Sequence, residues 1–250
     1  MSNVKLNIRI FSDIHNFNDP DKSYLGVIPQ RSLDKCIESA VISNKDLIVL
    51  LGDNSHDGSI DSYRRILECF SKYKCEKLIV AGNHDNLTNM NIVFGYTDWH
   101  KFNSKIIRAN VNIIALNTVV NNEDYGFLNN EELGKLKEIS RSKKELVIFM
   151  HHPPINIGSN IMDKLKITTG EVMLDILKSR STNTHIFFGH VHCDYSFKIG
   201  KISLNSVVST FRQFEKDKIG DYSPSLRGGW GNIFIQNGTL NNNSNKYIDL

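Results

Sequence analysis

The sequence has few cysteines and no long hydrophobic run. Its four cysteines are scattered and form no Cys-x-x-Cys pair, which suits reduced thiols rather than a disulfide scaffold. No apolar run approaches the roughly 18 residues that a membrane-spanning helix needs. Residues 1–5 lead directly into an alternating strand pattern and lack the apolar core of a signal peptide. We therefore expect a cytoplasmic protein without a membrane span.

A strong excess of one charge is also lacking. The 250 residues include 30 Lys and Arg against 27 Asp and Glu, a formal charge of +3. This balance supplies no broad basic surface, so nucleic acid is not an expected partner. Apolar residues make up 40% of the chain, as in folded globular proteins. The length favours one domain over residues 1–250, with a core over about residues 4–238 and a polar tract, 241–245, expected to be a frayed loop.

Short apolar runs alternate with helical stretches, which is typical of a layered α/β fold. The sequence predicts strands over residues 6–10, 47–51, 77–81, 111–116, 146–150 and 186–188. It predicts helices over residues 31–43, 63–70, 130–140 and 171–178. Beyond residue 194, short alternating runs with glycine turns between them indicate antiparallel hairpins.

Five of the predicted strands end in side chains that can bind metal. Each motif alone is weak, because Asp-x-His and Gly-Asp also occur in ordinary turns. In layered α/β folds, however, functional loops converge at the carboxyl ends of strands. The ordered set therefore predicts one shared site. Its members are Asp13 and His15, then Asp53, then Asn83 and His84, then His151, then His190 and His192.

The types of these residues indicate a centre of two transition-metal ions. Carboxylate, imidazole and amide oxygen together suit borderline ions such as Fe, Mn or Zn better than calcium. Two Asp, four His and one Asn are too many ligands for one ion and enough for two. A shared carboxylate can hold two ions about 3.5–4 Å apart, as in two-metal hydrolases. In extended backbone, both members of Asp13/His15 and of His190/His192 would face the same way.

The complete set resembles the motifs of calcineurin-like metallophosphoesterases. The resemblance runs from residue 13 to at least residue 192 and includes the glycines at 52, 82 and 189. Four further segments show a looser similarity to the bacterial class III cyclic nucleotide phosphodiesterase branch of this family. They lie at residues 57–59, 151–154, 209–214 and 223–230.

This resemblance implies a four-layer αββα sandwich with a C-terminal antiparallel hairpin region and a two-metal site at strand ends between the sheets. Position by position, it implies that Asp13, His15 and His192 hold the first metal. It likewise implies Asn83, His151 and His190 for the second metal, with Asp53 bridging the two. His84 would be catalytic, contacting a phosphate oxygen or protonating the leaving group. The substrate would lie against Asn83, His84 and His192.

The expected activity is that of a metal-dependent phosphoric diester hydrolase. A hydroxide bridging the two cations would attack phosphorus in line with the leaving alkoxide. The first candidate substrate is a 3′,5′-cyclic nucleotide, cAMP above all, and the product a nucleoside monophosphate. The alternative is a broad phosphodiesterase or phosphomonoesterase acting on glycerophosphodiesters, nucleotides or lipid-linked phosphates. A non-enzymatic module on this fold would normally lack a ligand or the phosphate-contacting histidine, and here all are present. The expected partner is thus a small-molecule phosphodiester, with a homodimer as a candidate assembly.

Several residues near the motifs leave alternatives open. Asp85 could orient His84 or form a plain turn, and Asp57 could support a ligand histidine or lie in a solvated loop. If the backbone there is extended, His152 faces away from the metals, and a structural role is favoured over that of a third ligand. His56 is expected to be a surface or satisfied polar residue. An aromatic cluster could stack a nucleobase, although a local hydrophobic patch is the favoured interpretation. It comprises Phe94, Tyr96, Trp99 and Phe102.

Overall fold

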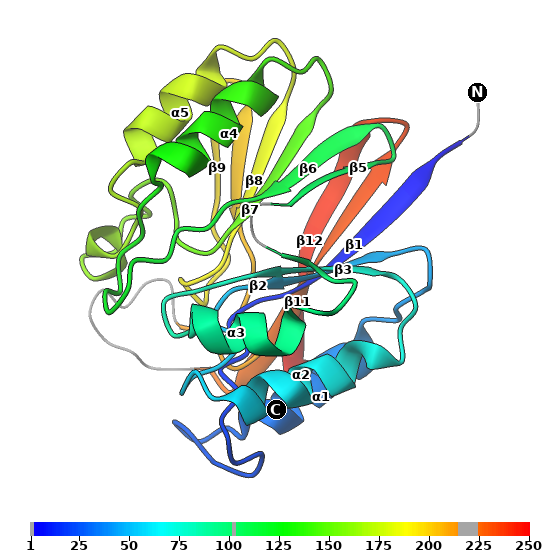
Figure 1. Cartoon of the computed structure of the whole chain (residues 1–250), viewed down its shortest axis with the longest axis vertical. Coiled ribbons are helices and arrows are strands. Elements are labelled where there is room, and N and C mark those ends of the chain that lie inside the picture. Colours follow the sequence, from blue (N-terminus) through cyan, green and yellow to red (C-terminus); the bar gives the residue numbers. More distant parts are fainter. Residues whose placement is uncertain (1–2, 102–103, 215–224) are drawn as a thin grey trace.

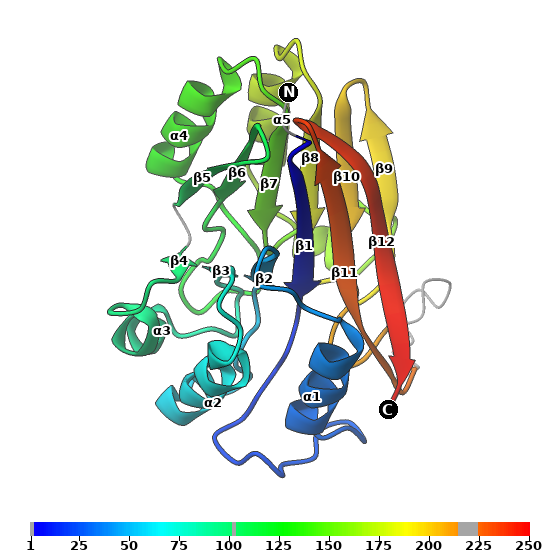
Figure 2. The same ribbon diagram turned by 90° about the vertical axis from the view of Figure 1, so that its right-hand side faces the viewer.

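Two β-sheets pack face to face, and helices cover their outer faces, in the computed structural model of the chain (Figures 1 and 2). The structure describes residues 3–101, 104–214 and 225–250. Within these residues each sheet has six strands, in the orders β12-β11-β1-β2-β3-β4 and β5-β6-β7-β8-β10-β9. The expected αββα sandwich is confirmed.

The first sheet combines four N-terminal strands with the C-terminal hairpin. Its strands are β1 (Lys5–Phe11), β2 (Leu47–Leu51), β3 (Glu76–Val80), β4 (His100–Lys101), β11 (Arg227–Gln236) and β12 (Thr239–Asp249). The helices on its outer face are α1 (Pro29–Ser39), α2 (Ile60–Ser71) and α3 (Leu87–Phe94). The helix expected over residues 31–43 ends early, because the chain turns left-handed at Val41, where φ is 44°. The short α3 has no strong amphipathic pattern, and the sequence did not indicate it.

The second sheet comes from the middle of the chain. Its strands are β5 (Lys105–Arg108), β6 (Val111–Ala115), β7 (Leu146–Met150), β8 (Thr184–Phe188), β9 (Ser196–Ile199) and β10 (Ile202–Ser206). Its outer face is covered by α4 (Asn130–Ser140) and α5 (Gly170–Lys178), and the 3-10 helix η1 (Met162–Lys164) lies between β7 and α5. Both β2 and β7 are parallel strands buried along their whole length, as their unbroken apolar runs predict.

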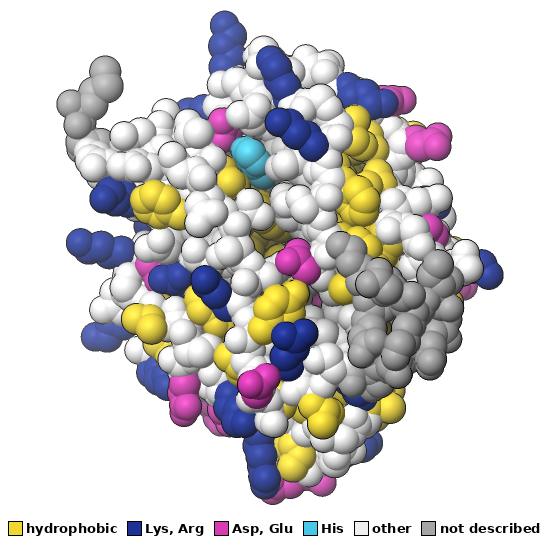
Figure 3. Space-filling view, turned by 180° about the vertical axis from the view of Figure 1, so that it is seen from behind, with side chains coloured by type: hydrophobic (Ala, Val, Ile, Leu, Met, Phe, Trp, Pro, Cys, Tyr) yellow, Lys and Arg dark blue, Asp and Glu magenta, His cyan; other side chains and the backbone are white. Residues whose placement is uncertain are grey.

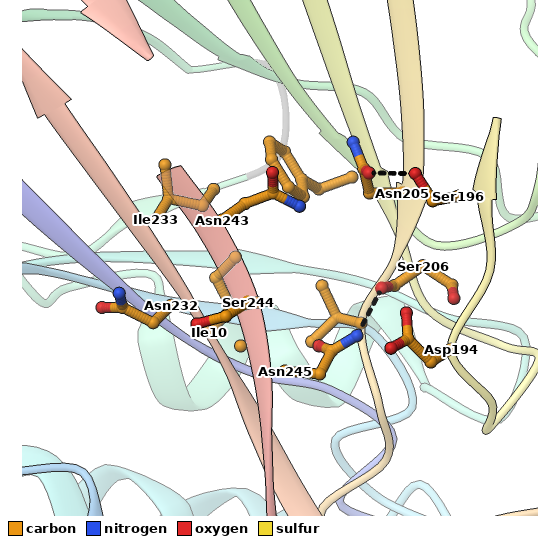
Figure 4. A pocket seen from close by; sticks show the side chains of 13 residues that line it. Ile10, Asp194, Ser196, Asn205, Ser206, Asn232, Ile233, Asn243, Ser244 and Asn245 are labelled. Atoms are coloured by element: carbon orange, nitrogen blue, oxygen red, sulfur yellow. Dashed lines mark hydrogen bonds between the residues drawn. The ribbon is translucent and has the colours of Figure 1, made fainter. Parts of the chain in front are cut away.

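The expected frayed loop at residues 241–245 is wrong. These residues belong to β12, which pairs antiparallel with β11 over its whole length. Asn243 and Asn245 point across the edge of the sandwich toward β10, and Asn245 Nδ2 donates to the Ser206 carbonyl at 3.2 Å (Figure 4). A polar run can form a strand here because its backbone pairs with β11, while its amides line a cavity of about 300 Å³ between the two hairpins. The expected C-terminal hairpins are present.

The face of the molecule shown in Figure 3 agrees with the modest net charge. On the face shown in Figure 3, Lys and Arg side chains are scattered, with Asp and Glu among them, and form no broad basic patch. Among the described residues, no helix combines the length and apolar character required to span a bilayer.

Candidate metal centre

The side chains predicted to bind metal gather in one cluster at the ends of five strands. These strands are β1, β2 and β3 of the first sheet and β7 and β8 of the second. Both sheets therefore contribute to the site, as the sequence predicts. The cluster contains Asp13, His15, Asp53, Asn83, His151, His190 and His192.

The backbone at this cluster is turned rather than extended. Asp13 and His15 have φ of 51° and 54°, and His190 and His192 have φ of 69° and 44°. The expectation that extended backbone aligns each pair is therefore wrong. Each pair converges because its residues adopt the left-handed conformation, which is uncommon outside glycine, is enriched for Asp and His, and concentrates at functional sites.

Glycines next to the cluster leave space for its side chains. A Cβ on Gly52 would lie 2.2 Å from His151 Nδ1, and a Cβ on Gly82 would lie 2.2 Å from Asp53 Oδ1. Both separations are far below van der Waals contact. Any other residue at either glycine would displace a member of the cluster, which gives the Gly-Asp and Gly-Asn motifs a steric reason.

A first group of donor atoms surrounds His192. Its Nε2 lies 3.2 Å from His15 Nε2 and 3.3 Å from Asp13 Oδ1. His192 Nδ1 lies 3.0 Å from the Arg212 carbonyl, which requires a proton on Nδ1 and leaves the Nε2 lone pair facing the group. Two imidazole nitrogens this close, beside a carboxylate, form a donor set that a cation would satisfy.

A second group surrounds His151. Its Nε2 lies 3.2 Å from Asn83 Oδ1 and 3.3 Å from Asp53 Oδ2, and its Nδ1 lies 3.1 Å from the Leu51 carbonyl. The His190 ring packs edge-on against His151, and within the described residues its buried Nε2 has no hydrogen-bond partner. An orphaned buried nitrogen of this kind fits a metal ligand.

Asp53 lies between the two groups. Its Oδ2, which is 3.3 Å from His151 Nε2, is also 3.7 Å from His15 Nε2. One carboxylate oxygen thus faces donor atoms of both groups, the position that a bridging ligand requires.

The electrostatics of the cluster link cation binding to the protonation of its side chains. Burial alone would raise the pKa of the Asp13 carboxyl, but His192 lowers it to about 2. Burial and His151 lower the pKa of His190 to about 3, so its imidazole is neutral near neutral pH. Burial would likewise lower the pKa of His151, but Asp53 raises it to about 9. A cation at His151 therefore competes with a proton.

Two histidines lie nearer the cluster than the sequence indicated. His152 is fully buried, and one of its ring nitrogens lies within 4.8 Å of nitrogens of His151 and His190. The chain bends at residues 151–152, so the extended backbone that would turn His152 away from the cluster is absent. Its Nδ1 contacts Thr118 Oγ1 at 2.7 Å, a contact that fits a structural role. His56 is half-buried and its Nδ1 lies 3.2 Å from His15 Nδ1, which agrees with the alternative of a satisfied polar residue. Its place three residues after Asp53 was the signal available in the sequence.

Two nearby carboxylates, those of Asp85 and Asp57, accept hydrogen bonds from loop residues and not from the predicted metal ligands. Asp85 is buried and accepts hydrogen bonds from the backbone N–H of Gly82 and of Ser55 and from the Tyr63 hydroxyl. The turn alternative for Asp85 is therefore the right one. Asp57 is exposed and accepts from Asn18 N and Ser59 N, as a loop residue does.

We expect Asp85→Ala to lower the free energy of unfolding by at least about 3 kcal/mol, because several buried donors lose their acceptor together. Denaturant unfolding measures the loss. Asp57→Ala, which removes bonds at an exposed loop, is the matched control and should cost about 1 kcal/mol. Equal losses in the two variants would contradict this role for Asp85.

The aromatic cluster between β3 and β5 is largely core. Phe94 and Trp99 are buried with their ring centroids 5.0 Å apart, and they pack with the helices that cover the first sheet. Tyr96 is 99% exposed. Phe102 lies outside the described residues. The favoured interpretation as a local hydrophobic patch is confirmed for Phe94 and Trp99.

A comparison with protein families decides the kinship of the chain. Residues 6–194 match the family described as calcineurin-like phosphoesterase. The chain belongs to this family. It is thus a metal-dependent phosphoesterase, and the family's fold implies two metal ions, in agreement with the two groups of donor atoms.

Curated relatives cover most of the chain. A "probable cyclic nucleotide phosphodiesterase" of Vesicomyosocius okutanii is 30% identical over 82% of this chain and 87% of its own length. The 3′,5′-cyclic adenosine monophosphate phosphodiesterase CpdA of Pseudomonas aeruginosa is 28% identical over 81% of this chain and 75% of its own. A "probable glycerophosphodiester phosphodiesterase GpdQ" of Arcobacter nitrofigilis is 28% identical over 72% and 70%, respectively.

Solved structures show the same fold. A dimetal phosphatase from Danio rerio superposes with a TM-score of 0.67 over 99% of both chains, at 12% identity. At this identity the likeness concerns the fold alone.

Proposed function

We propose that the protein is a phosphodiesterase that hydrolyses a 3′,5′-cyclic nucleotide, with cAMP as the first candidate, to the nucleoside monophosphate. The observation that carries the proposal is the convergence of all seven expected ligands at strand ends from both sheets. The similarity to relatives named as cyclic nucleotide phosphodiesterases supports the substrate class. The similarity to a relative named for glycerophosphodiesters keeps those substrates as the alternative.

The assignment of ligands follows the two groups of donor atoms. Asp13, His15 and His192 would hold one ion, and Asn83, His151 and His190 the other, with Asp53 shared. Two such cations, of Fe, Mn or Zn type, would supply a nucleophile from water near neutral pH and neutralise charge on the phosphoryl oxygens.

The substrate would bind in the open cavity above these ligands, which has a volume of about 250 Å³. Asn83, His84 and His192 line it. The His84 backbone N–H donates to Asp53 Oδ1 at 2.9 Å, which ties the position of this histidine to the bridging carboxylate. The exposed His84 ring can then donate a proton or a hydrogen bond to the departing oxygen.

A hydrolysis panel tests the proposal. The metal-free protein is loaded with Mn, Fe or Zn and assayed with cAMP, glycerophosphoethanolamine and a simple phosphomonoester. We expect kcat/KM for cAMP to exceed the other two by at least about tenfold. A chelator should abolish turnover, and added metal should restore it. Turnover of the glycerophosphodiester with inert cAMP under every metal would overturn the substrate assignment and leave the family assignment standing.

The cytoplasmic location, the single-domain organisation and the homodimer stay predictions. Light scattering of the purified chain measures the assembly.

A further inference from the structure

The cavity above the metal cluster has an aromatic wall built from three separate segments. Tyr24 comes from the loop between β1 and α1, His56 follows β2, and Phe211 follows β10. The Tyr24 ring stacks on Phe211 with centroids 5.7 Å apart and planes at 19°. It also lies 4.5 Å from the His56 ring. The Tyr24 side chain is half-buried, lies on a loop and is not one of the predicted metal ligands.

The loop that carries Tyr24 is held in place. Tyr24 and Val27 exchange both backbone hydrogen bonds, at 2.8 and 3.0 Å, so the tip between them is a tight turn. Arg212, itself only 2% exposed, donates from Nη1 to the Leu25 carbonyl at 2.6 Å. Arg65 donates to the Asn18 carbonyl at 2.7 Å, near the start of the same loop. A ring fixed in advance loses little conformational entropy when a ligand stacks on it.

Apolar side chains complete the sides of this cavity. Leu25 lines it, is 54% exposed and has a left-handed φ of 48°. Leu25 and Gly26 both have positive φ, as a two-residue turn of this kind requires, and the turn holds the Leu25 side chain at the cavity. Met162 and Leu165, from the connection between β7 and α5, line the same cavity. The cavity thus combines a floor of metal-binding groups with aromatic and apolar sides.

We propose that Tyr24 determines specificity by stacking against the planar base of a nucleotide whose phosphate lies over the metal cluster. This inference rests on the proposed function for the position of the phosphate. A glycerophosphodiester carries no ring and would leave the aromatic wall unused, whereas a nucleotide would cover it. The wall therefore favours a nucleotide over a ring-free diester.

Calorimetric binding of 5′-AMP and ribose 5-phosphate to the metal-loaded protein tests the inference. The two ligands share the phosphate and the sugar and differ by the base. We expect the wild type to bind AMP about 5- to 150-fold more tightly than ribose 5-phosphate, the range for one stacked base. Tyr24→Leu should lose most of this preference, and Tyr24→Phe, which keeps the ring, should retain it. Tyr96→Leu removes a fully exposed tyrosine outside the cavity and is the matched control.

Two outcomes would overturn the inference. One is equal binding of AMP and ribose 5-phosphate by the wild type, which needs no variant to fold. The other is an unchanged preference in a folded Tyr24→Leu protein. Failure of the proposed function looks different: AMP is preferred through Tyr24, yet no cyclic nucleotide is hydrolysed. In that case the base-binding role of Tyr24 holds for another nucleotide ester.

Discussion

Asp53→Asn is expected to abolish turnover and to lower the occupancy of both metal sites together. The reason is geometric, because Asp53 Oδ2 faces His151 of one group and His15 of the other. Asparagine has the same shape and tolerates the left-handed φ of 48° at this position, so the fold should survive. The loss of the carboxylate charge would weaken the binding of both ions at once. Metal analysis of the purified variant, alongside its kcat, measures the effect.

The matched control for this variant is Asp175→Asn. Asp175 is 71% exposed and pairs with Lys178 on α5, away from the cluster. Its substitution should leave turnover and metal content unchanged. Two bound ions and normal turnover in Asp53→Asn would remove Asp53 from the centre.

His84→Ala is expected to lower kcat by about 10²–10⁴-fold while metal content stays near two ions. His84 lines the cavity, and its exposed ring stacks on His56 at 4.7 Å. The seven other side chains would supply the ligands of both ions, which would leave His84 free to act on substrate. The loss should be smaller for bis(4-nitrophenyl) phosphate than for cAMP, because a good leaving group needs less protonation.

Two measurements separate the roles open to His84. Its ring nitrogen lies within 4.8 Å of nitrogens of His15 and His56, so loss of one ion in His84→Ala would make it a ligand instead. An equal loss of rate for good and poor leaving groups would assign it to charge stabilisation rather than proton donation. His100→Ala, on the edge strand β4, controls for the general effect of removing a histidine.

The buried strands were the most predictable part of the fold. An unbroken apolar run such as residues 47–51 has few alternatives to a parallel strand covered on both faces. The polar residues that end these runs could be predicted to converge, because the carboxyl ends of the strands in a layered α/β fold meet at one side of the molecule. By contrast, β12 could not be predicted, because its polar run resembles a loop until its pairing with β11 is known.

The neighbours of the predicted ligands were harder to predict than the cluster itself. His152 and His56 lie close to the cluster because the chain bends after β7 and because the loop after β2 folds over His15. The position of His56 three residues after Asp53 indicates that it lies near the cluster, but local spacing does not predict how the chain bends at either histidine. The same limit applies to aromatic residues: the cluster at residues 94–102 lies largely in the core, and the aromatic wall of the cavity comes from Tyr24, His56 and Phe211.

The sequence by itself determined the layered α/β class and which residues form the predicted metal-binding set, since the period of the strands and the residues that end them are local properties. Only the tertiary structure decided which donor atoms face one another, that Asp53 lies between two groups, and that Arg212 holds the loop of Tyr24 beside them through the Leu25 carbonyl. These depend on left-handed turns and on contacts between residues as far apart as 187 positions. Such contacts form only when the two sheets pack together.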